Sequence, residues 1–384
     1  MLANQDQSVS TTPTFDLKRL LDTVFTPKPG ERIAVFIDLD DPRDVIDLRY
    51  KRNPRWESQC FAYDVFYQGL LALKGGGYFT SVGFYSYRLT GGSNLDLPDS
   101  VFDLTGKELN LESVLRGYDI VLYIGTYSAT APITAIAKRL GFRGATMHGV
   151  NQTILESGLS KDYREVSRKA EAYRRLVTRS DAAEICFRMQ VQRFSLSIAL
   201  GAQEAQKSHG LCPNGGEIAN LPAGEVYFVP DDARGQLPIR YEDGTIALFT
   251  VNQMRLFEAR LLSGNPATVA QHLAKIKDDP ATGELGELGL GTQELPVSGA
   301  DIQDEKIIGT IHLATGRSDH LGGHLTPDKF LKPINATHDD ILFAPHKTPE
   351  IRVESVTFHQ NGESVLIIQN DQPTEIVRQA MARA

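Results

Sequence analysis

Hydrophobic positions in the first half of the chain form short continuous runs, and stretches with helical spacing separate them. The run from Tyr118 to Gly125 is the clearest, and its nearly unbroken apolar character is typical of a strand buried on both faces of a parallel sheet. We expect further strands at Arg32–Asp40, Phe79–Tyr87 and Ala145–Val150, and helices at Phe15–Val24, Ser58–Leu73 and 132–142. Strands that alternate with helices predict a layered α/β domain with a mostly parallel sheet.

The pattern changes after Ser160–Thr178, which has helical spacing and connects the two halves. Short runs with β character follow, separated by Gly, Pro, Asn and Asp, and only Ala267–Lys277 reads as a helix. An Asn361-Gly362 pair between two apolar runs predicts a β-hairpin. We therefore expect a disordered lead-in over 1–14, an α/β domain over 15–178 and a β-rich α+β domain over 179–384.

Composition and charge restrict the class of protein. The chain has 384 residues, 41% of them hydrophobic and 23% charged, as in globular proteins that fold in water. Its formal charge of -8 argues against nucleic acid as a partner, and no apolar run has the roughly 20 residues that a membrane span needs. The N-terminus lacks a secretory signal, and the three cysteines are too few and too widely spaced for a disulfide framework. We expect a cytoplasmic protein.

Six of the nine histidines lie between His312 and His359, often beside acidic residues. If H-D-D-I-L-F is a strand, His338 and Asp340 face the same side and can reach one ion. His312 lies within T-I-H-L-A-T-G, where it is either a ligand or a satisfied core residue. His320 and His324 follow in a glycine-rich loop, in which histidines are usually exposed to solvent.

Two glutamates have similar apolar surroundings. Glu225 in G-E-V-Y-F-V and Glu287 in G-E-L-G-L-G each follow a glycine and begin an apolar run. A carboxylate at the entrance of a buried strand loses hydration energy unless a cation or hydrogen bonds compensate. The two residues are therefore either ligands of a divalent metal or caps of turns in water. The chain contains no G-x-G-x-x-G placed for a dinucleotide, no Walker lysine motif and no G-x-S-x-G.

Four motifs in this order carry a resemblance to a known family. The series N-L-P-A-G-E-V-Y, L-G-E-L-G-L-G-T, D-E-K-I-I-G-T-I-H-L-A-T-G and H-D-D resembles the M29 family of metallo-aminopeptidases over about Arg179–Ile368. The resemblance implies an N-terminal α/β domain, a C-terminal catalytic domain with two divalent ions (zinc, cobalt or manganese), and a homodimer. The ligands that it implies in this chain are Glu225, Glu287, His312, His338 and Asp340.

The resemblance also implies roles for two further acidic residues. Glu305 matches, less closely, an acidic ligand just before the H-L-A-x-G histidine. Asp319 stands where the family peptidases carry a tyrosine. If the protein is a hydrolase, the metal centre would activate a water, and Glu305 or Asp319 would carry a proton to the leaving amine of a small peptide or amide.

Two alternatives remain open. The enzyme 2,5-dihydroxypyridine dioxygenase is similar to the same superfamily and uses one non-haem Fe(II), which His312, His338 and Asp340 could hold here. The dioxygenase motif has a histidine at the place that Glu287 occupies in this chain, so this chain retains the glutamate of the peptidase motif. The other alternative is a member repurposed for a biosynthetic pathway, for which the Asp319 loop is the sequence support.

Overall fold

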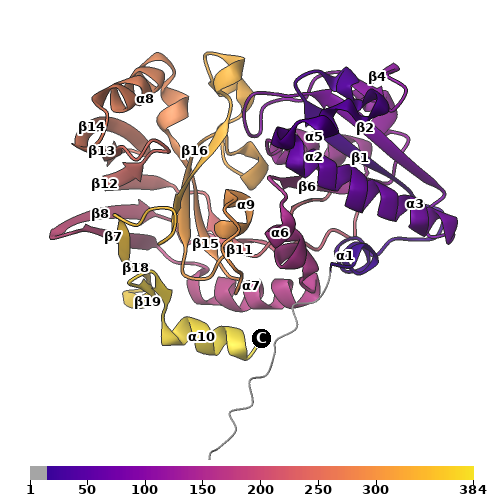
Figure 1. The fold of residues 1–384 in the computed structure, drawn as a ribbon. Coiled ribbons are helices and arrows are strands. Elements are labelled where there is room, and N and C mark those ends of the chain that lie inside the picture. Colours follow the sequence, from indigo (N-terminus) through magenta and orange to yellow (C-terminus); the bar gives the residue numbers. More distant parts are fainter. Residues whose placement is uncertain (1–14) are drawn as a thin grey trace, which may run out of the picture.

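The computed structural model describes residues 15–384, which form two blocks that lie side by side in Figure 1. The block with helices around a sheet contains the first half of the chain, and the block built mainly from strands contains the second half. The predicted lead-in over 1–14 lies outside the described residues. The prediction of an α/β fold with a β-rich second part is confirmed.

The first block contains a seven-stranded sheet with the order β10-β6-β5-β1-β2-β3-β4. Its strands are β1 (Arg32–Leu39), β2 (Ser81–Arg88), β3 (Ser100–Asp103), β4 (Glu108–Asn110), β5 (Ile120–Gly125), β6 (Arg143–His148) and β10 (Ile218–Asn220). The five strands from β10 to β2 are parallel, and β3 and β4 add an antiparallel edge. All six residues of β5 are buried, as its continuous apolar run predicts.

Helices cover both faces of this sheet. They are α1 (Leu17–Val24), α2 (Glu57–Phe61), α3 (Gln68–Gly75), α4 (Leu111–Leu115), α5 (Thr130–Leu140) and α6 (Gln152–Glu156). Helix α7 (Tyr163–Val177) follows them and packs against the second block, where its Tyr173 and Val177 belong to the hydrophobic core. The helix predicted at Ser58–Leu73 is continuous but contains a π-helical segment at Ala62–Tyr67, which its apolar spacing does not reveal. Pro42–Arg52 forms 3-10 turns that the sequence analysis did not predict.

One strand of the parallel sheet comes from the second half of the chain. After β7 (Ala182–Met189), β8 (Gln192–Ala199) and β9 (Gln206–Ser208), the chain returns to the first block, where β10 pairs with β6. Strand β10 is short and follows a Gly-rich and Pro-rich segment, so its three residues carry no recognisable pattern. The domain boundary after residue 178 stays a prediction.

The second block packs two antiparallel sheets against each other. The first has the order β17-β16-β15-β11-β9, with bounds His338–Phe343, Ile311–Gly316, Leu285–Gly291, Glu225–Phe228 and Gln206–Ser208. The second has the order β14-β13-β12-β8-β7-β18-β19-β20, with bounds Arg255–Ser263, Ile246–Asn252, Asp232–Arg240, Gln192–Ala199, Ala182–Met189, Arg352–Gln360, Glu363–Gln369 and Gln372–Pro373. One hydrophobic core joins them, because Leu288 and Leu313 of the first sheet belong to the same buried cluster as Leu196 and Phe249 of the second.

Three helices accompany these sheets: α8 (Pro266–Asp278), α9 (Asp301–Asp304) and α10 (Glu375–Ala382). Helix α8 confirms the helix predicted at Ala267–Lys277, and the other two were not predicted. The predicted hairpin is confirmed, since β18 and β19 are antiparallel and Asn361 and Gly362 both have positive φ (51° and 82°). Two such residues give a type I′ turn, whose twist matches that of the flanking strands.

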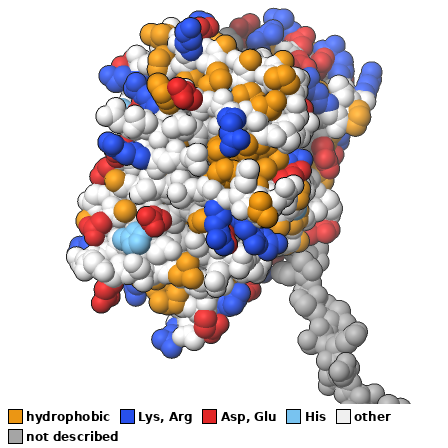
Figure 2. All heavy atoms as spheres, turned by 90° about the vertical axis from the view of Figure 1, so that its left-hand side faces the viewer, with side chains coloured by type: hydrophobic (Ala, Val, Ile, Leu, Met, Phe, Trp, Pro, Cys, Tyr) orange, Lys and Arg blue, Asp and Glu red, His pale blue; other side chains and the backbone are white. Residues whose placement is uncertain are grey.

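The outer face of the second block is shown in Figure 2, where hydrophobic side chains lie among Lys, Arg, Asp and Glu. The exposed hydrophobic residues of the second block include Phe257 and Leu261 of strand β14. Within residues 15–384, no helix is both long and apolar enough to cross a membrane.

Candidate metal centre

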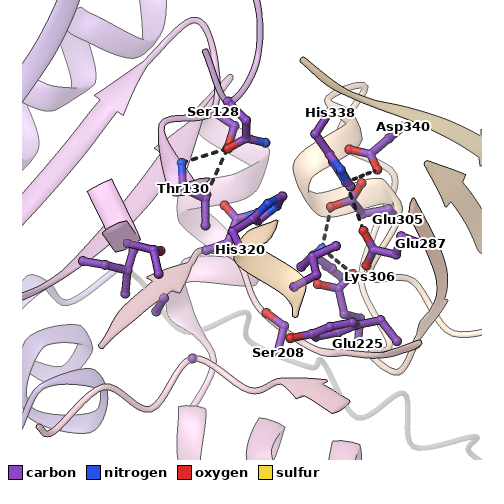
Figure 3. Close-up of a pocket in the computed structure, with 18 of the residues that line it drawn as sticks. Ser128, Thr130, Ser208, Glu225, Glu287, Glu305, Lys306, His320, His338 and Asp340 are labelled. Carbon is purple, nitrogen blue, oxygen red and sulfur yellow. Dashed lines mark hydrogen bonds and ion pairs between the residues drawn. The ribbon is translucent and has the colours of Figure 1, made fainter. Parts of the chain in front are cut away.

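Four neighbouring strands bring the predicted ligands to one face of the five-stranded sheet. Glu225 begins β11, Glu287 lies in β15, His312 in β16, and His338 begins β17. Figure 3 shows that Glu225, Glu287 and His338 converge with Asp340 at one side of a pocket, and His312 also lines this pocket. Residues far apart in the sequence therefore meet as the resemblance implies.

The sequence L-G-E-L-G-L-G of β15 explains why there is room for these side chains. Its three leucines are buried, with Leu288 and Leu290 in the core between the sheets. Gly289 and Gly291 share the opposite face with Glu287, since side chains alternate along a strand. Gly289 pairs with His312 and Gly291 with Glu225 in the adjoining strands. Gly289 leaves free the volume that the His312 imidazole occupies, whereas a Cβ on Gly291 would collide with the backbone carbonyl groups of Ile307 and Glu305.

His338 is oriented by a backbone contact. Its Nδ1 donates to the carbonyl oxygen of Arg317 at 2.6 Å, because a carbonyl can only accept a hydrogen bond. Its Nε2 then faces the centre, 3.0 Å from Glu287 Oε2 and 3.3 Å from Asp340 Oδ1. A histidine ligand of a metal is commonly fixed in this way, with the second ring nitrogen bonded to a carbonyl or carboxylate.

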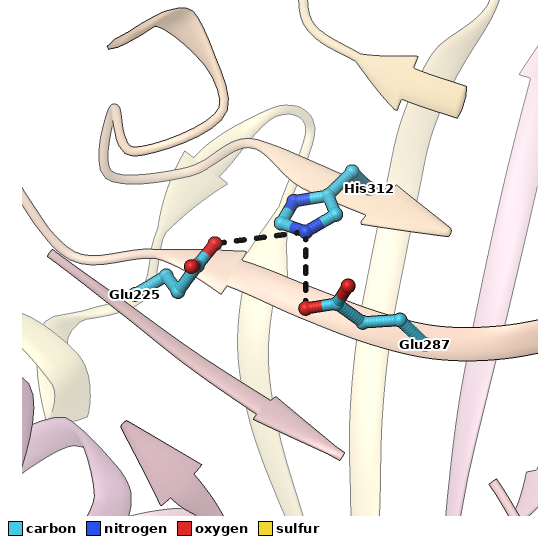
Figure 4. A group of neighbouring side chains, drawn as sticks. All are labelled: Glu225, Glu287 and His312. Atoms are coloured by element: carbon cyan, nitrogen blue, oxygen red, sulfur yellow. Dashed lines mark ion pairs between the residues drawn. The ribbon is translucent and has the colours of Figure 1, made fainter. Parts of the chain in front are cut away.

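His312 lies between two glutamates (Figure 4). Its Nε2 is 3.6 Å from Glu225 Oε2 and 3.5 Å from Glu287 Oε1, and only 2% of the side chain is exposed. Its Nδ1 is buried and has no hydrogen-bond partner within residues 15–384. His312 is thus not a core histidine whose hydrogen bonds are all satisfied, the alternative that its sequence context left open.

A lysine is buried beside these ligands. Lys306 Nζ lies 2.6 Å from Glu225 Oε2 and also contacts Glu305 Oε1, and its side chain is 1% exposed. The sequence analysis did not single out Lys306, although it lies in the D-E-K-I-I-G motif directly after Glu305. A buried ammonium requires anionic partners, and here two carboxylates supply them.

The charges at the centre favour a bound cation. Burial alone would lower the pKa of His338, but the Asp340 and Glu287 carboxylates raise it well above its usual value. Burial likewise opposes a proton on His312, yet Glu287, Glu305 and Glu225 raise the pKa of that imidazole to about 10. An electric field that strongly favours protons on two histidines also favours a divalent metal ion at their nitrogen atoms.

Ligand atoms of these residues lie close enough for three alternative metal sites. Within residues 15–384, three sets each have their ligand atoms within 4.8 Å of one another: Glu225, Glu287 and His312; Glu287, His338 and Asp340; Glu305, His312 and Asp340. Each set combines carboxylate oxygen with imidazole nitrogen, the ligands that suit zinc, cobalt, manganese and non-haem iron. The residues therefore fit the metal that the resemblance implies.

The centre lies in a pocket of about 210 Å³ between the two blocks. The first block supplies a wall of polar residues that follow the carboxyl ends of its parallel strands, where α/β folds usually bind ligands. These residues are Ser93, Asn94, Ser128, Thr130 and His148. Lys207, Ser208 and His209 close another side.

Asp319 lies next to this pocket but is directed to Arg317. Arg317 Nε donates to Asp319 Oδ1 at 2.7 Å, and Arg317 Nη1 donates to the Asn94 carbonyl at 2.7 Å and to Asp96 at 3.0 Å. Burial opposes ionisation, but the His320 and Arg317 side chains hold the pKa of Asp319 below its usual range. Asp319, which stands where the M29 peptidases carry a tyrosine, thus holds the arginine that links the second block to Asn94 and Asp96 of the first.

Two histidines of the pocket were missed by the sequence analysis. The side chain of His320 is only 6% exposed, and its ring lies 5.0 Å from that of His338 with the planes nearly perpendicular. The expectation that His320 is exposed was therefore wrong, whereas the His324 side chain is 70% exposed as expected. His148, at the end of β6, has a buried Nδ1 with no partner in the described part of the chain.

Comparison with known proteins supports the fold. The chain is similar to the solved structure of 2,5-dihydroxypyridine dioxygenase from Pseudomonas putida KT2440, with a TM-score of 0.61 and 15% sequence identity. The match covers 94% of this chain and 95% of the dioxygenase chain, so both blocks and their arrangement are shared. No family model and no curated protein matches the sequence. Membership of the M29 family stays a prediction.

Proposed function

We propose that this protein is a metal-dependent hydrolase of the M29 aminopeptidase type, which removes an N-terminal residue or cleaves a related amide. The observation that carries the proposal is the convergence of Glu225, Glu287, His312, His338 and Asp340 on one centre at a pocket, where all of them except Asp340 are buried. The chemistry of the side chains supports a cation there, because buried carboxylates that lie close together lose hydration energy and repel one another unless a cation compensates.

The residues around the centre have distinct tasks. A bound divalent ion would polarise the scissile carbonyl group and lower the pKa of a water molecule. Burial raises the pKa of Glu305 above its usual value, against the opposing effect of Lys306. Because Glu305 lies beside His312 and Asp340 and its raised pKa favours uptake of a proton, we assign proton transfer to Glu305. Asp319 is less suited, because the His320 and Arg317 side chains, although burial opposes ionisation, hold the pKa of its carboxyl group below its usual range.

The size of the pocket restricts the substrate. A volume of about 210 Å³ is below the roughly 300–1,000 Å³ of sites for drug-sized ligands, which favours a small group such as one terminal residue. Polar groups of the first block, among them Ser128 and Thr130, face this space and can orient the substrate by hydrogen bonds.

A second candidate is a mononuclear Fe(II) ring-cleaving dioxygenase. It is favoured by the similarity in fold to 2,5-dihydroxypyridine dioxygenase over nearly the whole of both chains. The set of Glu287, His338 and Asp340 would provide three ligands and leave open positions, as in non-haem iron enzymes, although with one histidine rather than two.

Metal analysis and activity assays distinguish the two candidates. We expect protein purified without added metal to contain zinc, cobalt or manganese and to hydrolyse amino-acid anilides, with activity lost to a chelator and restored by metal. Iron together with oxygen uptake on a dihydroxypyridine would instead establish the dioxygenase. A folded protein that binds no divalent metal would refute both.

Ligand variants test the centre itself. Glu287→Ala and His338→Ala should each lose metal and activity while the protein remains folded. Asp339→Ala is the matched control, because Asp339 is adjacent in sequence but pairs with Lys275 at 3.1 Å and is absent from the three ligand sets. If Glu287→Ala or His338→Ala retains full metal content, the assigned ligands are wrong.

A further inference from the structure

Lys306 has an unusual position for a positively charged residue, since its ammonium lies among the candidate metal ligands. We propose that this ammonium takes the place of one of the two metal ions, so that the centre holds a single divalent ion bound by Glu287, His338 and Asp340. The inference rests on the proposed function, because it concerns the number of ions at the same centre.

The three possible ligand sets support this assignment. Lys306 Nζ contacts Glu225 Oε2 at 2.6 Å and also contacts Glu305 Oε1. The sets that contain Glu225 or Glu305 therefore each share a carboxylate with the ammonium. The set of Glu287, His338 and Asp340 contains neither glutamate, and within residues 15–384 it is the one set that Lys306 leaves complete.

Distances also oppose a second ion beside the ammonium. A metal bound to a carboxylate oxygen lies about 2.0–2.2 Å from it. An ion on Glu225 Oε2, which is 2.6 Å from Lys306 Nζ, would then lie at most about 5 Å from the ammonium nitrogen. Two like charges at this distance repel strongly in a buried site, because little water screens them.

The lysine cannot easily move away, because its backbone is held on both sides. The Lys306 N–H donates to the Gln303 carbonyl at 2.9 Å, and the Lys306 carbonyl accepts from the Gln293 N–H at 2.8 Å. Thr310 adds a hydrogen bond from its hydroxyl to the Glu305 carbonyl at 3.1 Å. Only 1% of its side chain is exposed, so neighbouring residues also restrict its movement.

The experiment is a count of bound ions per full-length chain by native mass spectrometry and elemental analysis, with zinc in excess. We expect one ion in the wild type and two in Lys306→Met, whose Glu225 and Glu305 are free to bind metal. Lys207→Met is the matched control, because Lys207 also lines the pocket but pairs with Glu171 at 3.1 Å. This control should keep one ion.

Each outcome has a defined meaning. Two ions in the wild type, or one ion in a folded Lys306→Met, would overturn the inference and leave the proposed function standing. No ion in the wild type would overturn both. If Lys306→Met does not fold, two other variants test the inference. We expect Glu225→Gln to keep the single ion and Glu287→Gln to lose it. Loss of the ion from Glu225→Gln would contradict the inference.

Discussion

Gly289 is the position where one added methyl group should displace a candidate ligand. It pairs with His312 across β15 and β16, and a Cβ built on it would lie 2.0 Å from His312 Cε1 and 2.2 Å from Nε2. Carbon atoms in contact are normally about 3.5–4.0 Å apart, so Gly289→Ala requires the imidazole to move by roughly 1.5 Å. The ring is buried and cannot move without disturbing its neighbours.

Two opposing effects set the expected size of the change. Overpacking a buried site costs about 1–3 kcal/mol, whereas replacing glycine by alanine stabilises by about 0.4–1 kcal/mol where the backbone permits. The steric cost dominates, because the contact at 2.0 Å is far inside van der Waals distance. We expect Gly289→Ala to lower the free energy of unfolding by about 1–2 kcal/mol in the presence of a chelator.

A double-mutant cycle with His312→Ala isolates this contact. Unfolding in urea would be measured for the wild type, both single variants and the double variant, with chelator present so that bound metal does not contribute. In the His312→Ala background the added methyl group has space, so Gly289→Ala should become neutral or stabilising. Gly75→Ala is the control, since a Cβ there meets nothing within 4 Å. An equal cost of Gly289→Ala in both backgrounds would refute the reasoning.

Three further predictions concern stability. Burial lowers the pKa of His272 to about 4, so the protein loses free energy of unfolding as the pH falls from 6.5 towards 4. The variant His272→Gln lacks this titrating group. Between pH 7 and pH 5 its free energy of unfolding, measured in urea titrations, should therefore fall by roughly 2 kcal/mol less than that of the wild type. An unchanged pH profile would contradict this. Arg143→Met breaks a buried ion pair with Glu31 at 2.8 Å and should lower the free energy of unfolding by about 3–5 kcal/mol. Adding Glu31→Gln removes the unpaired charge and should restore part of this stability. If the double variant is no more stable than Arg143→Met, the pair does not contribute as stated. Gly362→Ala, at a φ of 82° in open space, should cost about 1–2 kcal/mol by thermal unfolding, and a neutral result would exclude the type I′ turn.

The parts of the fold with strong patterns could be predicted from sequence. Buried parallel strands such as β5 have continuous apolar runs. The pair Asn361-Gly362 readily adopts the two positive φ values that a type I′ hairpin turn needs, so it marks the hairpin clearly. Strand β10 could not be predicted, because three residues carry no periodicity and their pairing with β6 depends on the tertiary fold. The π-helical segment inside the predicted helix has the same apolar spacing as an ordinary helix, so sequence alone does not reveal it.

The candidate site could likewise be predicted from the sequence only in part. The residues matched by the resemblance converge because they lie on adjacent strands of one sheet. Lys306 and His320 were missed because their sequence contexts resemble those of exposed charged or loop residues. Their burial arises from contacts with Glu225 and with the ring of His338, which are distant in sequence. Sequence spacing does not predict such contacts.

The pocket is built from two parts of the chain that contribute different properties. All the candidate ligands come from the second block, whereas Ser93, Ser128 and Thr130 of the opposite wall come from the first. Substitutions in that wall can change which molecule is accepted while the affinity for the ion stays the same. Evolution can therefore alter selectivity and reactivity separately in this architecture, and so can a protein engineer.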